Sequence, residues 1–179
     1  MGTIILLKKP DAKLEPIDFE KTVVATWVDF VKKGEQKIGQ DLNEDLESFL
    51  VFTLMRFMRR TDLFSVTLAL EFLNASSEYT GHKKEQALSS VGDISLILAG
   101  LFPERTKNLN VSPSYFVEIG RMAFEELATS FERRNIKSHA NLYHSVCQGF
   151  PFMAKVLLSA REDKNAYDLT SPCPLISLV

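Results

Sequence analysis

The segment FLVFTLMRFMRRTDLFSVTLALEFLNASSEYTGHKKEQALSSVGDISLILAGLF, residues 49–102, decides the fold of this chain. It is apolar over whole helical turns, a pattern that is typical of buried helices rather than surface helices. Single charges stand inside these turns: Arg56 in LMRFM, Glu71 in LALEFLN and Asp93 in SVGDISLIL. A buried charge needs a partner or a shifted pKa. The segment therefore predicts a helical core that contains an internal polar network.

Periodic apolar positions continue on both sides of this segment and predict an all-α fold, a bundle of about seven helices. Asp18 is a candidate N-cap, Gly34 a candidate stop, and Ser112 followed by Pro113 a clear helix start. We expect the second to fourth helices to form the centre. The expected helices cover residues 18–33, 43–60, 61–73, 82–101, 112–132, 136–148 and 151–161.

The length of 179 residues fits one helical domain over residues 1–179, with an N-terminal arm at 1–17, a helical core at 18–161 and a C-terminal tail at 162–179. Two alternatives involve strands. The β-branched run Thr22-Val23-Val24 also fits a strand. The two chain ends, around residues 3–9 and 172–179, could pair as a short β-ribbon. Gly92 and Gly100 weaken the fourth helix unless close packing requires them.

Charge and cysteine content limit the function classes. The net charge of −2 gives no basic field, so we expect neither a nucleic-acid partner nor an anionic membrane partner. No apolar run is long enough for a transmembrane helix. The short apolar run in MGTIILLKKP does not fit a secretory signal, and the chain has only two cysteines, which favours the cytoplasm. The sequence gives no support for a disulfide between Cys147 and Cys173.

Five isolated charges are the candidate ligand-binding residues: Arg56, Glu71, Asp93, Glu118 and Arg121. Glu118 and Arg121 are three residues apart and therefore share one helical face. The functional interpretation is a polar pocket between helices that binds a small molecule. The alternative is a structural network that fixes the helix register, or narrow stripes of charge that face solvent.

Catalytic and metal motifs are few. His144 and Cys147 are three residues apart, so they could share a metal ion, or the imidazole could lower the pKa of the thiol. A small cysteine buried in the core is the simpler expectation for Cys147. His139 is five residues from His144, about 140° around a helix, and does not converge with it. The chain lacks HExxH, GxSxG and both phosphate-binding glycine patterns. We therefore expect no metal and no cofactor, and a metal enzyme is the weakest alternative.

These observations lead to a functional hypothesis that depends mainly on missing motifs. The chain is expected to be a non-enzymatic cytoplasmic helical protein, in an adaptor or regulatory role, that acts through protein–protein contacts as a homodimer. Most of the 13 phenylalanines are expected to be buried between helices. A partner or dimer surface would form if some of four that lie close together in sequence were exposed: Phe49, Phe52, Phe57 and Phe64. The alternative is a small-molecule-binding or enzymatic helical domain. The C-terminal Ser177-Leu178-Val179 could add to a sheet edge of a partner, although packing on its own domain is the simpler expectation.

Overall fold

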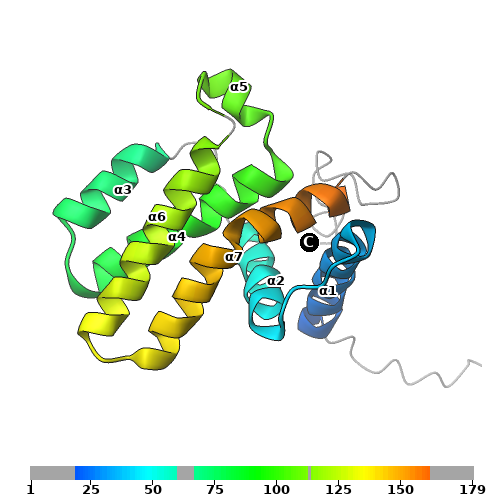
Figure 1. Cartoon of the computed structure of the whole chain (residues 1–179), viewed down its shortest axis with the longest axis horizontal. Coiled ribbons are helices and arrows are strands. Elements are labelled where there is room, and N and C mark those ends of the chain that lie inside the picture. The colour runs from blue at the N-terminus through cyan, green and yellow to red at the C-terminus, as the bar shows by residue number, and fades with distance from the viewer. Residues whose placement is uncertain (1–18, 60–66, 113, 162–179) are drawn as a thin grey trace, which may run out of the picture.

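The computed structural model describes residues 19–59, 67–112 and 114–161. Within these ranges the chain forms helices and no strand, which confirms the predicted all-α bundle (Figure 1). The predicted cap at Asp18, the β-ribbon of the chain ends and the C-terminal peptide lie outside the described residues. The helices are α1 (Phe19–Ile38), α2 (Glu44–Met58), α3 (Leu68–Ser77), α4 (Gly81–Leu101), α5 (Arg105–Leu109), α6 (Tyr115–Arg133) and α7 (Lys137–Arg161).

Three helices, α4, α6 and α7, form the centre, and each packs against the other two. On one side α3 lies against α4 and α6, and on the other α1 and α2 lie against α7 (Figure 1). Every residue from Val91 to Leu98 of α4 is buried, so the prediction of a buried helix is right for this element. The expected central position of the second and third helices is wrong, because α6 and α7 pack against α4 there. None of the described helices combines the length and the apolar character needed to cross a membrane.

The glycines of α4 lie where neighbouring helices cross it. A Cβ atom at Gly92 would lie 2.4 Å from the ring of Phe124 in α6. A Cβ atom at Gly100 would lie 2.6 Å from the Cβ atom of Leu157 in α7. A glycine inside a helix costs about 1 kcal/mol relative to alanine. Close packing of α6 and α7 on α4 offsets this cost. This packing is the condition under which the sequence analysis expected both glycines inside one helix.

Helix α1 does not stop at Gly34 but continues to Ile38. A Cβ atom at Gly34 would lie 2.3 Å from the backbone oxygen of Val156, so this glycine allows α1 and α7 to cross closely. The helix ends instead before Gly39, which has a φ of +73°. The N–H of Gly39 donates to the backbone oxygen of Glu35 at 2.8 Å. The predicted stop was wrong because helix ends and close helix crossings both select glycine. The strand alternative for Thr22-Val23-Val24 is also excluded, since these residues belong to α1.

The two helices expected over 136–148 and 151–161 form one continuous helix, α7, with Pro151 inside it. Gly149 lies in the same helix and packs against Leu46 of α2, since a Cβ atom there would lie 2.6 Å from the Leu46 side chain. The short helix α5 was not predicted. Helix α6 begins at Tyr115, with Ser114 rather than Ser112 at its N-cap position.

A buried carboxylate joins α1 to the start of α2. Glu35 is fully buried; its Oε1 accepts the backbone N–H of Leu42 at 2.8 Å, and its Oε2 pairs with Lys32 at 3.0 Å. Lys32 also donates to Glu47 of α2 at 2.7 Å. Asn43 then caps α2 by accepting the N–H of Leu46. These bonds fix the turn that places α2 beside α1.

Candidate functional site

Two of the five candidate charges meet between α2 and α4. Arg56 Nε donates to Asp93 Oδ2 at 2.8 Å, and Arg56 Nη2 donates to Asp93 Oδ1 at 3.1 Å. Nη2 also donates to the hydroxyl of Thr53 at 2.9 Å. Paired bonds between a guanidinium and a carboxylate are both stronger and more directional than single bonds. The pair therefore fixes α2 against α4 at this point.

The two partners are unequally buried. The side chain of Arg56 is 49% exposed, whereas that of Asp93 is 12% exposed. The guanidinium also lies over the ring of Phe49, with 5.8 Å between its central carbon and the ring centroid. Its described bonds use Nε and Nη2, so the Nη1 edge has no partner within the described part of the chain. Within the described residues, Arg56 is thus a guanidinium held in place by Asp93 and Thr53, with the two N–H groups of Nη1 not used.

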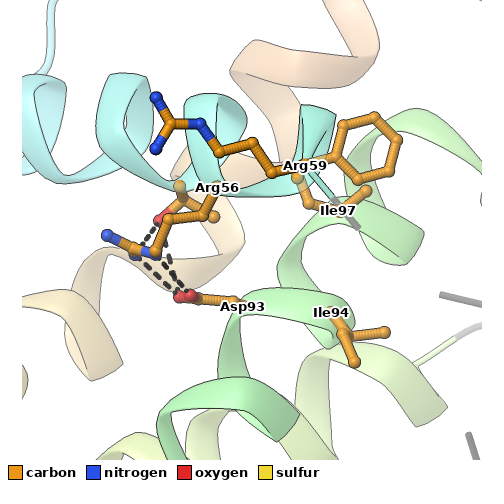
Figure 2. A pocket seen from close by; sticks show the side chains of 7 residues that line it. Arg56, Arg59, Asp93, Ile94 and Ile97 are labelled. Atoms are coloured by element: carbon orange, nitrogen blue, oxygen red, sulfur yellow. Dashed lines mark hydrogen bonds and ion pairs between the residues drawn. The ribbon is translucent and has the colours of Figure 1, made fainter. Parts of the chain in front are cut away.

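A depression of about 270 Å³ adjoins this pair. The apolar part of its lining comes from Phe57, Ile94 and Ile97. Figure 2 shows Arg56 turned toward Asp93, while the side chain of Arg59 extends away from Asp93. The described residues of its lining are Thr53, Arg56, Phe57, Arg59, Asp93, Ile94 and Ile97. The site is therefore an apolar hollow with charged groups at its edge.

The other three candidate residues lie apart from this pair. Glu71 is partly buried in α3. Glu118 is exposed on α6 and accepts a hydrogen bond from the Ser114 hydroxyl. Arg121 is exposed, and its Nε donates to the backbone oxygen of Cys147 at 3.2 Å. Among the described residues, the five charges therefore do not line one pocket. The apolar sequence around Glu118 and Arg121 hid the solvent-facing side of an amphipathic helix.

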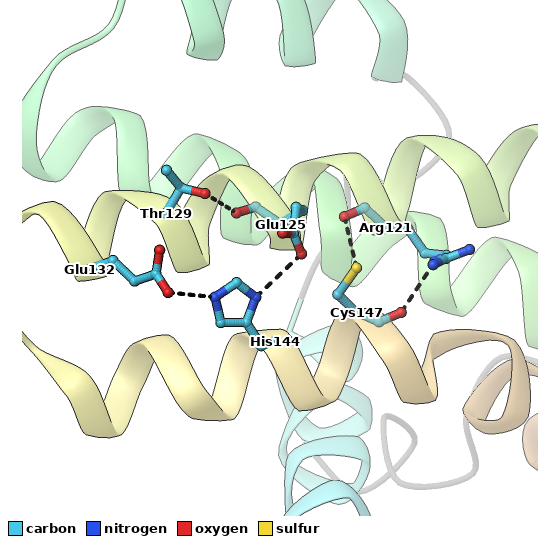
Figure 3. A network of polar contacts seen from close by, with 6 residues as sticks. All are labelled: Arg121, Glu125, Thr129, Glu132, His144 and Cys147. Atoms are coloured by element: carbon cyan, nitrogen blue, oxygen red, sulfur yellow. Dashed lines mark hydrogen bonds and ion pairs between the residues drawn. The ribbon is translucent and has the colours of Figure 1, made fainter.

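A second polar cluster lies between α6 and α7 (Figure 3). The imidazole of His144 lies between two carboxylates of α6, with Nε2 2.9 Å from Glu132 Oε1 and Nδ1 3.4 Å from Glu125 Oε2. The hydrogen bond with Glu132, followed by that with Glu125, raises the pKa of His144. Both carboxylate side chains are 55% exposed, so solvent screens these interactions.

Cys147 is a buried core cysteine, and activation of its thiol by His144, the other possibility that the sequence offered, is excluded. Its thiol is buried and donates to the backbone oxygen of Arg121 at 3.5 Å, while His144 turns toward the α6 carboxylates (Figure 3). Burial raises the pKa of the Cys147 thiol, which lowers the thiolate fraction at neutral pH. Cys173 lies outside the described residues. In the described ranges, no group of three or more His, Cys, Asp or Glu side chains is placed to hold a metal ion.

Sequence reasoning missed two side chains near the Arg56–Asp93 pair. Thr53 precedes Arg56 by three residues, and this spacing on one helical face was an available signal. Tyr143 of α7 stacks on Phe131, with ring centroids 5.6 Å apart, and its hydroxyl bonds to Ser89. Burial raises the pKa of Tyr143, and Asp93 and Arg56 both contribute to its electrostatic surroundings. No local pattern could place a residue of α7 beside α2 and α4.

No protein-family model, no curated protein and no solved structure matches this chain. The candidate site is therefore assigned from its own geometry and chemistry.

Proposed function

We propose that this is a non-enzymatic cytoplasmic helical protein that acts through protein–protein contacts. One of these contacts joins two copies of the chain in a homodimer. The observation that supports this proposal is the outer face of α3. Leu70 and Leu73 are 56% and 60% exposed, and their spacing places them on one face. Thr67 and Ser77 are also exposed and uncharged. Adjacent exposed apolar side chains on an uncharged face favour a contact with another protein.

The expected phenylalanine surface does not form among the described side chains. Phe52 is the exposed large aromatic residue in that part of the chain. Elsewhere in the described ranges, the exposed large apolar side chains are Leu109 on α5 and Met122 on α6. Leu70 and Leu73 are thus the pair on a common face. In a twofold dimer, antiparallel α3 helices would place Leu70 of one protomer against Leu73 of the other.

Sedimentation velocity over a range of protein concentrations tests this proposal. We expect a dimer for the unchanged chain and a monomer for the Leu70→Glu/Leu73→Glu double variant, because two carboxylates would be buried in the contact. Met122→Glu is the matched control, since Met122 is 51% exposed on a different helix and its variant should stay dimeric. Circular dichroism should give the same helicity for all three proteins. A monomer at every concentration, or a double variant that remains dimeric, would contradict the proposal.

A second candidate function is a small-molecule-binding or enzymatic helical domain. The hollow of about 270 Å³ beside Arg56 and Asp93 favours it. Native mass spectrometry of gently purified protein tests this candidate. Additional mass that is present on the unchanged chain and absent from the Arg56→Lys variant would support this candidate. The mass of the bare chain in both proteins would favour the protein-contact proposal.

A further inference from the structure

We infer that the hollow between α2 and α4 binds a slender apolar chain with one anionic head group, of the class of short alkyl carboxylates. The inference rests on the small-molecule alternative above and is independent of the α3 contact. Its three supports are the form of the hollow, the charges at its edge and the fixed position of Arg56.

The form of the hollow favours a narrow ligand. Its volume of about 270 Å³ is at or below the lower end of small-molecule pockets, which start near 300 Å³. Ile94 and Ile97 line the hollow, yet each is only 1% exposed. Little of the apolar surface is therefore open to solvent, and a linear chain can reach it more easily than a broad ring system or a protein helix.

The charges at the edge favour an anion over a cation. Among the described residues, the ionised side chains that line the hollow are those of Arg56, Arg59 and Asp93. The carboxylate of Asp93 is already engaged by the Nε and Nη2 atoms of Arg56. An ammonium head group would have to compete with Arg56 for Asp93. A carboxylate head group can instead accept from the Nη1 edge of Arg56 without breaking the existing pair.

Arg56 is also positioned before any ligand arrives. Asp93 and Thr53 bond to its guanidinium, and the Phe49 ring lies beneath it. A side chain that is already ordered loses less conformational entropy when it binds a ligand. The fixed guanidinium next to an apolar hollow therefore provides one site for the head group and one for the chain.

Nuclear magnetic resonance of protein with labelled isoleucine methyl groups, titrated with hexanoate, tests the inference. We expect the methyl signals of Ile94 and Ile97 to shift and saturate, while those of Ile38, Ile119 and Ile136 remain in place. Hexan-1-ol should bind about tenfold more weakly, because it lacks the charged head group, and hexylammonium more weakly still. Absence of shifts at Ile94 and Ile97, or equal binding of hexanoate and hexylammonium, would overturn the inference.

The variant Arg56→Lys isolates the head-group contact, because lysine retains the charge and loses the guanidinium edge. Hexanoate should bind Arg56→Lys about tenfold more weakly than the unchanged chain, and hexan-1-ol should bind both equally. Arg133→Lys is the matched control, since Arg133 is exposed in the last turn of α6. An equal loss of affinity for hexanoate and hexan-1-ol, or an unchanged affinity for hexanoate, would exclude this role of Arg56. The isoleucine signals report the fold of each variant, and sedimentation separates failure of this site from failure of the dimer.

Discussion

At the scale of single residues, the unequal burial of Arg56 and Asp93 predicts unequal costs of removing them. Arg56→Ala should lower the free energy of unfolding by about 1–2 kcal/mol, because the largely buried Asp93 carboxylate loses its paired bonds. Asp93→Ala should cost less, since the half-exposed guanidinium can be hydrated by water. Urea unfolding measures both values. The cost for Arg56 is below the roughly 3–5 kcal/mol expected of a fully buried pair because half of that side chain is already in water.

The control for this prediction is Arg133→Ala, which removes an exposed arginine and should change stability by less than about 0.5 kcal/mol. If Arg56→Ala lowered the free energy of unfolding by only about a few tenths of a kcal/mol, the pair would add nothing measurable to stability. An equal or greater loss for Asp93→Ala would contradict the asymmetry.

His144 gives a second residue-scale prediction, on pH dependence. Its pKa in the folded protein is raised above the ordinary 6.5 by Glu132 and Glu125. The protonated ring therefore stabilises the fold fully below the unfolded pKa, provided that both glutamates are ionised, and this contribution is lost as pH rises through the folded pKa. His144→Gln should reduce stability by a few tenths of a kcal/mol at about pH 6 and by less at about pH 9.

Urea unfolding of His144→Gln and the unchanged chain at both pH values checks this prediction. His139→Gln is the control, because its ring contacts Ser138 and Phe131 rather than carboxylates. A difference between His144→Gln and the unchanged chain that grows toward high pH would show that the sign is wrong.

At the scale of helices, the glycines determine how closely neighbours approach. Gly34→Ala would raise the helix propensity of α1, yet we expect it to lower stability by about 1–3 kcal/mol. The reason is that its Cβ atom would lie 2.3 Å from the backbone oxygen of Val156, and a backbone atom cannot rotate away. Thermal and urea unfolding measure the effect.

Gly39→Asn, just after the end of α1, is the control, since nothing lies within 4 Å of the Gly39 Cβ position and asparagine tolerates the positive φ better than most residues. It should cost less than Gly34→Ala. If Gly34→Ala were neutral or stabilising, α1 and α7 would not be held at this separation.

At the scale of the whole molecule, the single-domain prediction has a direct consequence for unfolding. Trp27, the sole tryptophan of the chain, is buried in α1, and its Nε1–H donates to the sulfur of Met58 in α2 at 3.0 Å. Its fluorescence therefore reports on the α1–α2 layer, whereas far-ultraviolet circular dichroism reports on every helix. Because both helices pack on α7, we expect the two urea transitions to coincide. A lower midpoint by fluorescence would divide the chain into two cooperative units.

The sequence alone was sufficient for the properties that depend on local spacing. A period of 3.6 residues identified the helical segments other than the short α5, although it divided α7 into two helices. The apolar run identified α4 as buried, because burial of a whole helix follows from the composition of that helix. Arg56 and Asp93 stood out for the same reason, as single charges inside largely apolar helical turns. Local spacing also located the start of α2 at Asn43, whose side chain accepts a bond from Leu46.

Only the tertiary structure decided which partner each of these residues has. By sequence alone, a glycine that allows a close helix crossing cannot be distinguished from one that ends a helix. The structure shows that another helix crosses closely at Gly34, Gly92 and Gly100. Arg56 pairs with Asp93, 37 residues away, whereas Arg121 bonds to the backbone of α7. The distinction depends on which helix faces meet, and that is set by the summed packing of α4, α6 and α7 rather than by any local pattern.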